Sequence, residues 1–128
     1  MTQPRLNETH LDSSLSLRTA QWADCEAVAG VIYAVCEADG DTTVAVTPEE
    51  LKNEWQSEGF NPETDAFIIE TKDGRIVGYE EFGNQHEHYN LRTDGYVHPQ
   101  FKGLGIGTTL LRRAEARAIE EMQLAEPD

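Results

Sequence analysis

In the first half of the chain, the spacing of hydrophobic residues changes from every second position to every third or fourth position. Residues 15–17 alternate leucine with a polar side chain, which is the pattern of a half-buried strand. From Trp22 to Cys36, apolar residues recur at steps of three and four positions instead, which predicts an amphipathic helix. Asp39-Gly40-Asp41 then provides residues that end helices. A strand followed by a helix is therefore expected before residue 42.

A second helix is predicted shortly afterwards. Thr47 can cap its start, Pro48 suits the first helical position, and Glu50 can complete a capping box. We expect this helix to run to about Glu58. The two tryptophans of the chain fall on the two helices, and we expect both side chains to pack against the protein.

The second half of the chain predicts three strands and a last helix. An apolar run from Ala66 to Ile69 is followed by the hairpin signal Asp73-Gly74, and strand character resumes from Ile76 to Phe82. A polar connection from Gly83 to His88 leads to the next strand, from Leu91 to Val97. A helix opened by three glycines follows. The order strand, helix, helix, strand, strand, strand, helix predicts an α/β or α+β fold.

The length of 128 residues and the hydrophobic content of 38% suit one compact domain. Residues 1–13 are polar and aperiodic, so we interpret them as a flexible leader and residues 14–128 as the domain. No stretch is apolar enough for a signal segment or a membrane span, which predicts a cytoplasmic protein. Cys25 and Cys36 form no metal or redox spacing and are expected to be buried on a helix.

The net charge of the chain limits the classes of molecule that it is expected to bind. The chain has 24 acidic and 10 basic side chains, a formal net charge of -14 at pH 7. Such a charge repels nucleic acid and anionic lipid, so we expect neither nucleic-acid nor membrane binding. The acidity is explained either by a solubilising surface or by a cationic amine substrate, and the composition alone does not separate the two.

The stretch from Tyr96 to Leu111 carries the strongest chemical signal. A strand ends there, three glycines alternate at positions 103, 105 and 107, and a helix begins. The first amides of a helix have no intrahelical partner, the helix dipole adds positive charge, and glycines let phosphate oxygens approach the backbone. This junction therefore predicts an anion site that suits a diphosphate.

The spacing excludes two common nucleotide motifs. A Walker A loop needs a lysine after its last glycine, whereas Thr108 follows Gly107, and the glycine spacing does not fit the dinucleotide fingerprint. Lys102-x-x-Gly105-x-Gly107, after a strand that ends in Val97-His98-Pro99, instead resembles the acyl-coenzyme A signature of the GNAT superfamily of N-acyltransferases. Glutamine or arginine usually occupies the position of Lys102 in that family.

The resemblance extends over roughly residues 15–122 and implies a mixed sheet flanked by helices. It implies acetyl-coenzyme A, or another acyl-coenzyme A, as co-substrate and an amine of a small molecule or protein as acceptor. The family pattern places the pyrophosphate on the backbone amides of the loop, with Lys102 beside it and the pantetheine arm along the preceding strand. The implied cofactor residues are Tyr96, Val97, Lys102, Gly103, Leu104, Gly105, Ile106, Gly107 and Thr108.

Local charge agrees with a polyanionic ligand. Residues 91–118 carry five basic and two acidic side chains, a net of +3, so the rest of the chain carries -17. A basic segment in an acidic protein suits a phosphate-rich cofactor, but arginines on a helix surface are also often simply solvated. Both interpretations remain open from the sequence.

Acyl transfer to an amine needs a base, and carboxylates near the end of the last strand are the first candidates. Asp94 and Glu81 are predicted as catalytic residues, with Glu80 as an alternative. Because adjacent strand residues point to opposite faces, only one of the two glutamates can face a given side of the sheet. No metal site is predicted, since His86 and His88 have no third ligand at a recognisable spacing.

The resemblance stops before the last strands and helix of the family fold, because only six residues follow Met122. We therefore expect a partial domain with little activity of its own, and a sheet edge at the strand ending in Val97 that could pair with a second copy. The alternative is a non-catalytic acyl-coenzyme A-binding or interaction module within a larger tandem-domain protein.

Overall fold

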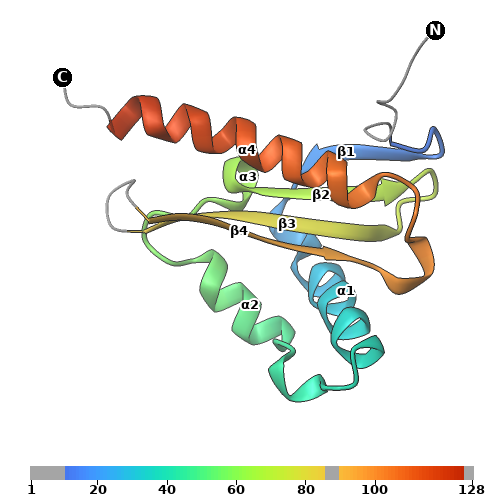
Figure 1. Cartoon of the computed structure of the whole chain (residues 1–128). Coiled ribbons are helices and arrows are strands. Elements are labelled where there is room, and N and C mark those ends of the chain that lie inside the picture. The colour runs from blue at the N-terminus through green and yellow to red at the C-terminus, as the bar shows by residue number, and fades with distance from the viewer. Residues whose placement is uncertain (1–10, 86–89, 126–128) are drawn as a thin grey trace, which may run out of the picture.

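The computed structural model describes residues 11–85 and 90–125, and its described part is an antiparallel sheet between helices (Figure 1). The sheet has the order β1-β2-β3-β4, in which each strand pairs antiparallel with its sequence neighbour. The strands are β1 (Leu15–Thr19), β2 (Ala66–Thr71), β3 (Ile76–Gln85) and β4 (Asn90–Val97). The helices are α1 (Cys25–Ala38), α2 (Pro48–Trp55), α3 (Pro62–Asp65) and α4 (Ile106–Ala125). This is the predicted order of elements with one short helix added.

The β3–β4 hairpin is longer than predicted. Gly83 to His88 was expected to be a polar connection, but β3 continues to Gln85 and β4 begins at Asn90. Gln85 pairs with Asn90 in the register, so the backbone ladder continues through polar residues. Backbone pairing does not depend on apolar side chains, which is why the hydrophobic pattern ended the strand too early. His86 and His88 lie outside the described residues.

The helices also differ from the prediction at their ends. A short 3₁₀ turn at Trp22–Asp24 precedes α1, which begins at Cys25. Helix α2 ends at Trp55 and not at Glu58: the amide of Ser57 bonds to the carbonyl of Glu54, three residues back, and the chain then turns at Gly59, where φ is 87°. Its start is as predicted: Thr47 accepts a hydrogen bond from the amide of Glu50 at 3.1 Å, and the capping box is complete.

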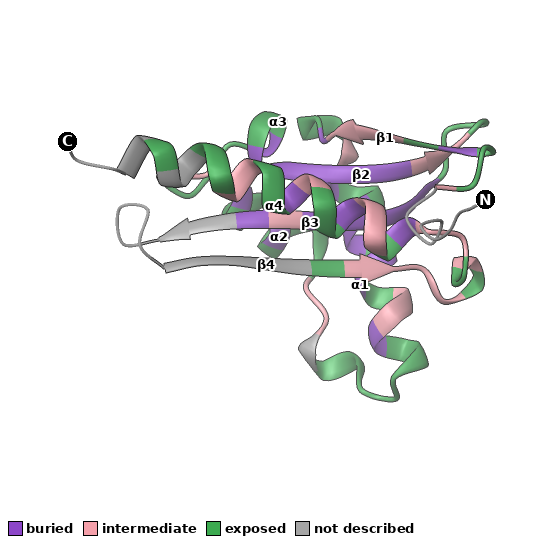
Figure 2. Ribbon diagram, turned by 45° about the horizontal axis from the view of Figure 1, so that its top comes forward, coloured by how far each residue is buried: buried purple, intermediate pink, exposed green. Residues whose placement is uncertain are grey.

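Two hydrophobic layers hold the sheet between the helices, and β2 is buried on both faces (Figure 2). Ala66 and Ile68 pack with α1 and α2, whereas Phe67 and Ile69 pack with α4. This alternation follows from the two-residue period of a strand. Cys25 and Cys36 are free and buried on α1, as expected. In the described residues, no helix is long and apolar enough to cross a membrane.

The segment before β1 contacts the loop that opens α4. Residues 1–10 lie outside the described part of the chain, but Leu11 packs against the α4 layer of the core. The amide of Asp12 donates a hydrogen bond to the carbonyl of Leu104 at 2.9 Å. The boundary at residue 13 between leader and domain stays a prediction.

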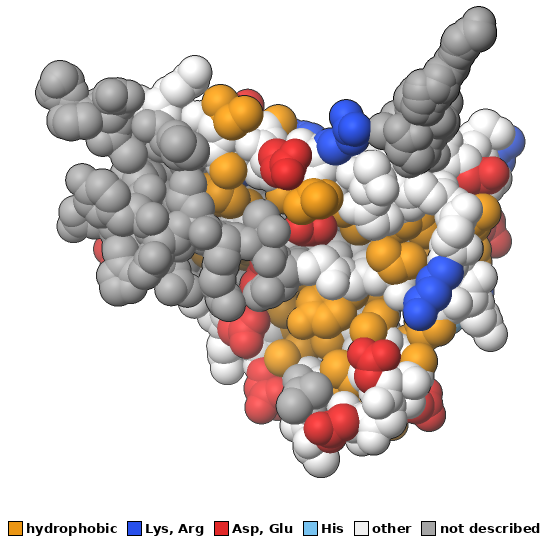
Figure 3. Space-filling view, viewed as in Figure 1, with side chains coloured by type: hydrophobic (Ala, Val, Ile, Leu, Met, Phe, Trp, Pro, Cys, Tyr) orange, Lys and Arg blue, Asp and Glu red, His pale blue; other side chains and the backbone are white. Residues whose placement is uncertain are grey.

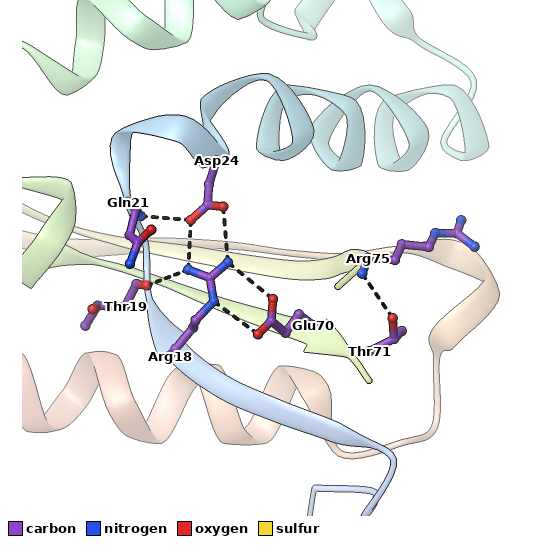
Figure 4. A network of polar contacts seen from close by, with 7 residues as sticks. All are labelled: Arg18, Thr19, Gln21, Asp24, Glu70, Thr71 and Arg75. Carbon is purple, nitrogen blue, oxygen red and sulfur yellow. Dashed lines mark hydrogen bonds and ion pairs between the residues drawn. The ribbon is translucent and has the colours of Figure 1, made fainter. Parts of the chain in front are cut away.

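Arg18 ties the first strand to its neighbours, as Figure 4 shows. Its guanidinium lies 2.9 Å from Asp24, before α1, and 3.2 Å from Glu70 on β2. Partial burial raises the pKa of Asp24, but hydrogen bonds from Arg18 and from the amide of Gln21 outweigh this, so the pKa is lowered. The ion pairs therefore contribute stability that depends on pH.

Arg18→Met is expected to lower the free energy of unfolding by about 1 kcal/mol at neutral pH, because the pair is only partly shielded from solvent. The folded-state pKa of Asp24 lies below its ordinary value, so this contribution is present above pH 4 or so and is lost as the pH falls through the folded-state pKa. Urea unfolding at neutral and strongly acidic pH measures both values. Arg112→Met, on the exposed side of α4, is the control. An equal loss at both pH values would contradict the prediction.

Candidate functional site at the β4–α4 junction

The backbone between β4 and α4 is shaped by a short turn and two glycines. His98 begins a 3₁₀ turn at Pro99–Phe101, and its Nδ1 accepts a hydrogen bond from the amide of Gln100 at 3.1 Å. Gly103 and Gly105 then have φ values of 83° and 84°, a region that side chains rarely adopt. Two of the three glycines are therefore needed for the path of the chain itself.

This path leaves a hollow of about 460 Å³ at the start of α4. It is lined by Val97, Phe101, Lys102, Gly103, Gly105, Ile106, Gly107 and Thr108. The first intrahelical hydrogen bond here runs from the amide of Thr109 to the carbonyl of Gly105, so the preceding amides belong to the open end of the helix. The hollow thus combines backbone donors, the positive end of a helix dipole and one lysine.

Most of the predicted cofactor residues meet at this hollow, and two do not line it. Leu104 is partly buried against the core, and its carbonyl accepts a hydrogen bond from the amide of Asp12. Tyr96 lies on the other side of the sheet, where its ring stacks on Tyr79 at 6.4 Å between centroids. Phe101 lines the hollow although the sequence did not single it out. An aromatic residue just before a glycine-rich turn is a signal that could have found it.

Two of the basic residues in this segment have structural contacts. The guanidinium groups of Arg113 and Arg117 lie over the rings of Phe67 and Phe82, at 4.6 and 5.9 Å from the centroids. Arg117 also pairs with buried Asp65 at 2.8 Å. These contacts fix α4 to the sheet and to α3, so not all of the local positive charge lies at the hollow.

His98 and Arg75 flank the hollow on the side of the β2–β3 hairpin. Arg75 lies 3.3 Å from Nε2 of His98, and its guanidinium stands over the ring of Phe101 at 5.3 Å. Partial burial, and then the charge of Arg75, lower the pKa of His98. The imidazole is therefore neutral at neutral pH and acts as the cap of the turn.

The candidate bases divide between the two faces of the sheet. Glu80 is buried on the α4 face, where its carboxylate fills the space beside Gly95: a side chain at Gly95 would meet it at 2.5 Å. Glu81 points to the face of α1 and α2 and accepts a hydrogen bond from the hydroxyl of Tyr79 at 2.6 Å. Asp94 is the register partner of Glu81 on β4, and its side chain lies outside what the structure describes. The predicted catalytic positions are thus adjacent.

On the α1–α2 face, hydrophobic side chains gather near the middle of the view and acidic side chains lie further out, over the two helices (Figure 3). Ala45, Val46, Phe60 and Tyr96 are partly buried against the core of this face. Trp55 is fully buried, as expected, whereas Trp22 packs edge-on against it and remains 44% exposed. Trp22 also lines a second hollow of about 450 Å³, with Cys25, Glu26, Pro48 and Lys52 among its walls.

Comparisons with known proteins agree with this geometry. The sequence model described as "Acetyltransferase (GNAT) family" matches residues 17–126. A GCN5-related N-acetyltransferase from Sphaerobacter thermophilus is 34% identical, with a TM-score of 0.79 over 91% of this chain and 36% of its own. An N-acetyltransferase from Staphylococcus aureus Mu50 is 22% identical, with a TM-score of 0.67 over 85% of this chain and 68% of its own.

A third solved structure contains the cofactor. The GNAT superfamily phosphinothricin acetyltransferase from Sinorhizobium meliloti, in complex with acetyl-coenzyme A, is 19% identical, with a TM-score of 0.65 over 84% of this chain and 60% of its own. The chain thus spans 36% of the Sphaerobacter protein and 60 to 68% of the other two. No curated protein matches it significantly.

Proposed function

The chain belongs to the acetyltransferase (GNAT) family, and from this premise we propose that it binds acetyl-coenzyme A and takes part in transfer of the acetyl group to an amine. The observation that carries this proposal is the hollow at the start of α4, in which backbone amides, two left-handed glycines and Lys102 converge. These are the donors that a diphosphate requires. The Sinorhizobium relative binds acetyl-coenzyme A within the same fold.

In this proposal the amides of Gly103 to Thr108 hold the pyrophosphate and Lys102 neutralises part of its charge. The pantetheine arm pairs with the main chain of Tyr96 and Val97 on β4. Among the described strands, β4 pairs only with β3, so its other side is available as a sheet edge. A second copy of the chain could use the same edge, and we propose that dimerisation and cofactor binding compete for it.

We assign the base to the Glu81 and Asp94 pair. A pantetheine arm that runs back along β4 from Val97 brings the thioester toward the middle of that strand, where Glu81 and Asp94 are register partners. The surrounding acidic surface favours a positively charged amine as acceptor, because opposite charges raise its local concentration. Glu80 is not assigned a role in transfer, since it is buried on the opposite face.

Coenzyme A is expected to bind at least about tenfold more tightly than pantetheine, which lacks the phosphates that the loop would hold. Isothermal titration with both ligands tests the pyrophosphate site, and a thiol-release assay with acetyl-coenzyme A and simple amines tests transfer. Binding without turnover, also in any longer protein that contains this chain, would favour the acyl-coenzyme A-binding module instead. Equal affinity for the two ligands would refute the proposed site. Light scattering with and without coenzyme A reports on the competing dimer.

A further inference from the structure

Three side chains on the α1–α2 face form a directed chain of hydrogen bonds. The indole Nε1 of Trp55, the last residue of α2, donates to the hydroxyl of Tyr79 on β3 at 3.1 Å. That hydroxyl lies 2.6 Å from Oε1 of Glu81, two residues along the same strand. Trp55 and Tyr79 are fully buried, so the bond between them is shielded from solvent, whereas the bond from Tyr79 to Glu81 is partly buried.

The direction of this chain is fixed by chemistry. An indole nitrogen can only donate, so the Tyr79 oxygen accepts from Trp55 and directs its single proton to Glu81. The ring of Tyr79 is also held between two aromatic rings: it stacks on Trp55 at 6.3 Å and on Tyr96 at 6.4 Å. The hydroxyl therefore has one position and one orientation.

The donor is permanent at physiological pH. Burial, and then the negative charge of Glu81, raise the pKa of Tyr79 well above its ordinary value, so the phenol keeps its proton. A donor that never ionises favours the charged form of the carboxylate that it contacts. A charged carboxylate is the form that accepts a proton from an ammonium group.

The chain of contacts leads to the strand that the proposed cofactor would follow. Tyr79 pairs with Tyr96 in the register, and Glu81 pairs with Asp94. The register partner of Glu81 is thus two positions from Tyr96, whose main chain is assigned to pantetheine. Glu80, its neighbour in sequence, faces the other side and has no part in this arrangement.

We propose that Tyr79 is a positioning residue, oriented by Trp55, which holds the Glu81 carboxylate ionised to accept a proton from the acceptor amine. This inference rests on the proposed function. Glu81 takes one proton from the ammonium group; the freed lone pair forms the C–N bond with the thioester carbonyl. The C–S bond then breaks, its electron pair leaves with sulfur, and the second nitrogen proton neutralises the thiolate. Glu81 returns its proton to water.

Glu54 on α2 acts in the opposite sense, because it contributes negative charge at Tyr79. Asp94 is the backbone register partner of Glu81 on β4. Negative neighbours favour the protonated carboxylate, whereas the hydroxyl of Tyr79 favours the ionised one. On β2 the register partner is Ala66, which does not titrate. Removing the hydroxyl alone should therefore raise the pKa of Glu81.

The test is an NMR titration of glutamate side-chain carboxyls in the full chain, which needs no turnover. Tyr79→Phe, which keeps the ring and its stacking, is expected to raise the midpoint of Glu81 by about one pH unit. Tyr33→Phe, which removes a hydroxyl from an exposed tyrosine on α1, should leave the midpoint unchanged. In the thiol-release assay, the pH at which kcat/KM falls on the acid side should rise by the same amount in Tyr79→Phe.

A second measurement uses the unmodified protein, in case Tyr79→Phe does not fold. The indole N–H signal of Trp55 should titrate with the midpoint of Glu81, and that of Trp22 should not. An unchanged Glu81 midpoint in folded Tyr79→Phe, or a Trp55 signal that ignores that midpoint, would overturn the inference. Neither result bears on cofactor binding. Failure of coenzyme A to bind the unmodified protein would refute the proposed function while leaving both midpoints measurable.

Discussion

Gly107→Val is expected to lower the affinity for coenzyme A about a hundredfold, which corresponds to two charged hydrogen bonds of about 1.5 kcal/mol each. Gly107 lines the hollow at the start of α4. A Cβ at this position would lie 3.7 Å from Val97, which is ordinary contact, so the protein itself accepts a side chain. The added methyl groups would instead occupy the space that the pyrophosphate oxygens need.

Gly107 is chosen because a side chain there should affect coenzyme A binding without disturbing the fold. Gly105 has a φ of 84°, so a valine there would strain the backbone and confuse the two effects. Gly30 is the matched control, because it lies exposed on α1 with open space around it, and Gly30→Val should bind coenzyme A normally. Circular dichroism confirms the fold and isothermal titration measures the affinity. Undiminished binding by folded Gly107→Val would remove the hollow as the cofactor site.

Gly78→Ala is expected to lower the free energy of unfolding by about 1 to 3 kcal/mol through overpacking. An added Cβ would lie 2.6 Å from Cγ2 of Ile106 and 3.2 Å from Leu110, which are both buried on the side of α4 that faces the sheet. The glycine therefore lets the first turn of α4 rest directly on β3. Because Ile106 also lines the hollow, the same change should weaken coenzyme A binding.

A double-mutant cycle with Ile106→Ala tests this packing. Ile106→Ala alone leaves a cavity and should destabilise the protein, but it also removes the atom that the new Cβ would strike. The double variant should therefore be more stable than the sum of the two losses predicts, by at least about 0.5 kcal/mol. Urea unfolding provides the four free energies. Simple additivity would mean that the loss in Gly78→Ala does not arise from contact with Ile106.

Local signals in the sequence were sufficient for most elements and for the hollow. The capping box at Thr47, the turn at Asp73-Gly74 and the alternating glycines each act within a few residues, so their geometry follows from nearby chemistry. The four-residue helix α3 was missed, since Asn61-Pro62 indicates a turn as readily as a helix. Polar pairing in the β3–β4 hairpin was missed because the strand signal was hydrophobic alternation.

Contacts between distant elements could not be predicted in this way. The hydrogen bond from Trp55 to Tyr79 joins a helix to a strand 24 residues later, and Arg117 meets Asp65 across 52 residues. Only the positions of Tyr79 and Glu81, two apart on one strand face, carried a local hint of their pairing. The separation of Glu80 from Glu81 followed from alternation, but which face each glutamate occupies depended on where α4 packs.

The hydrogen bond from the Asp12 amide to Leu104 makes the chain ahead of β1 a part of the loop's support. The loop is thus braced from behind by a segment more than ninety residues upstream, while its front faces the hollow. A change at residues 11 and 12 would therefore reach the proposed cofactor loop through this contact and not through the sheet.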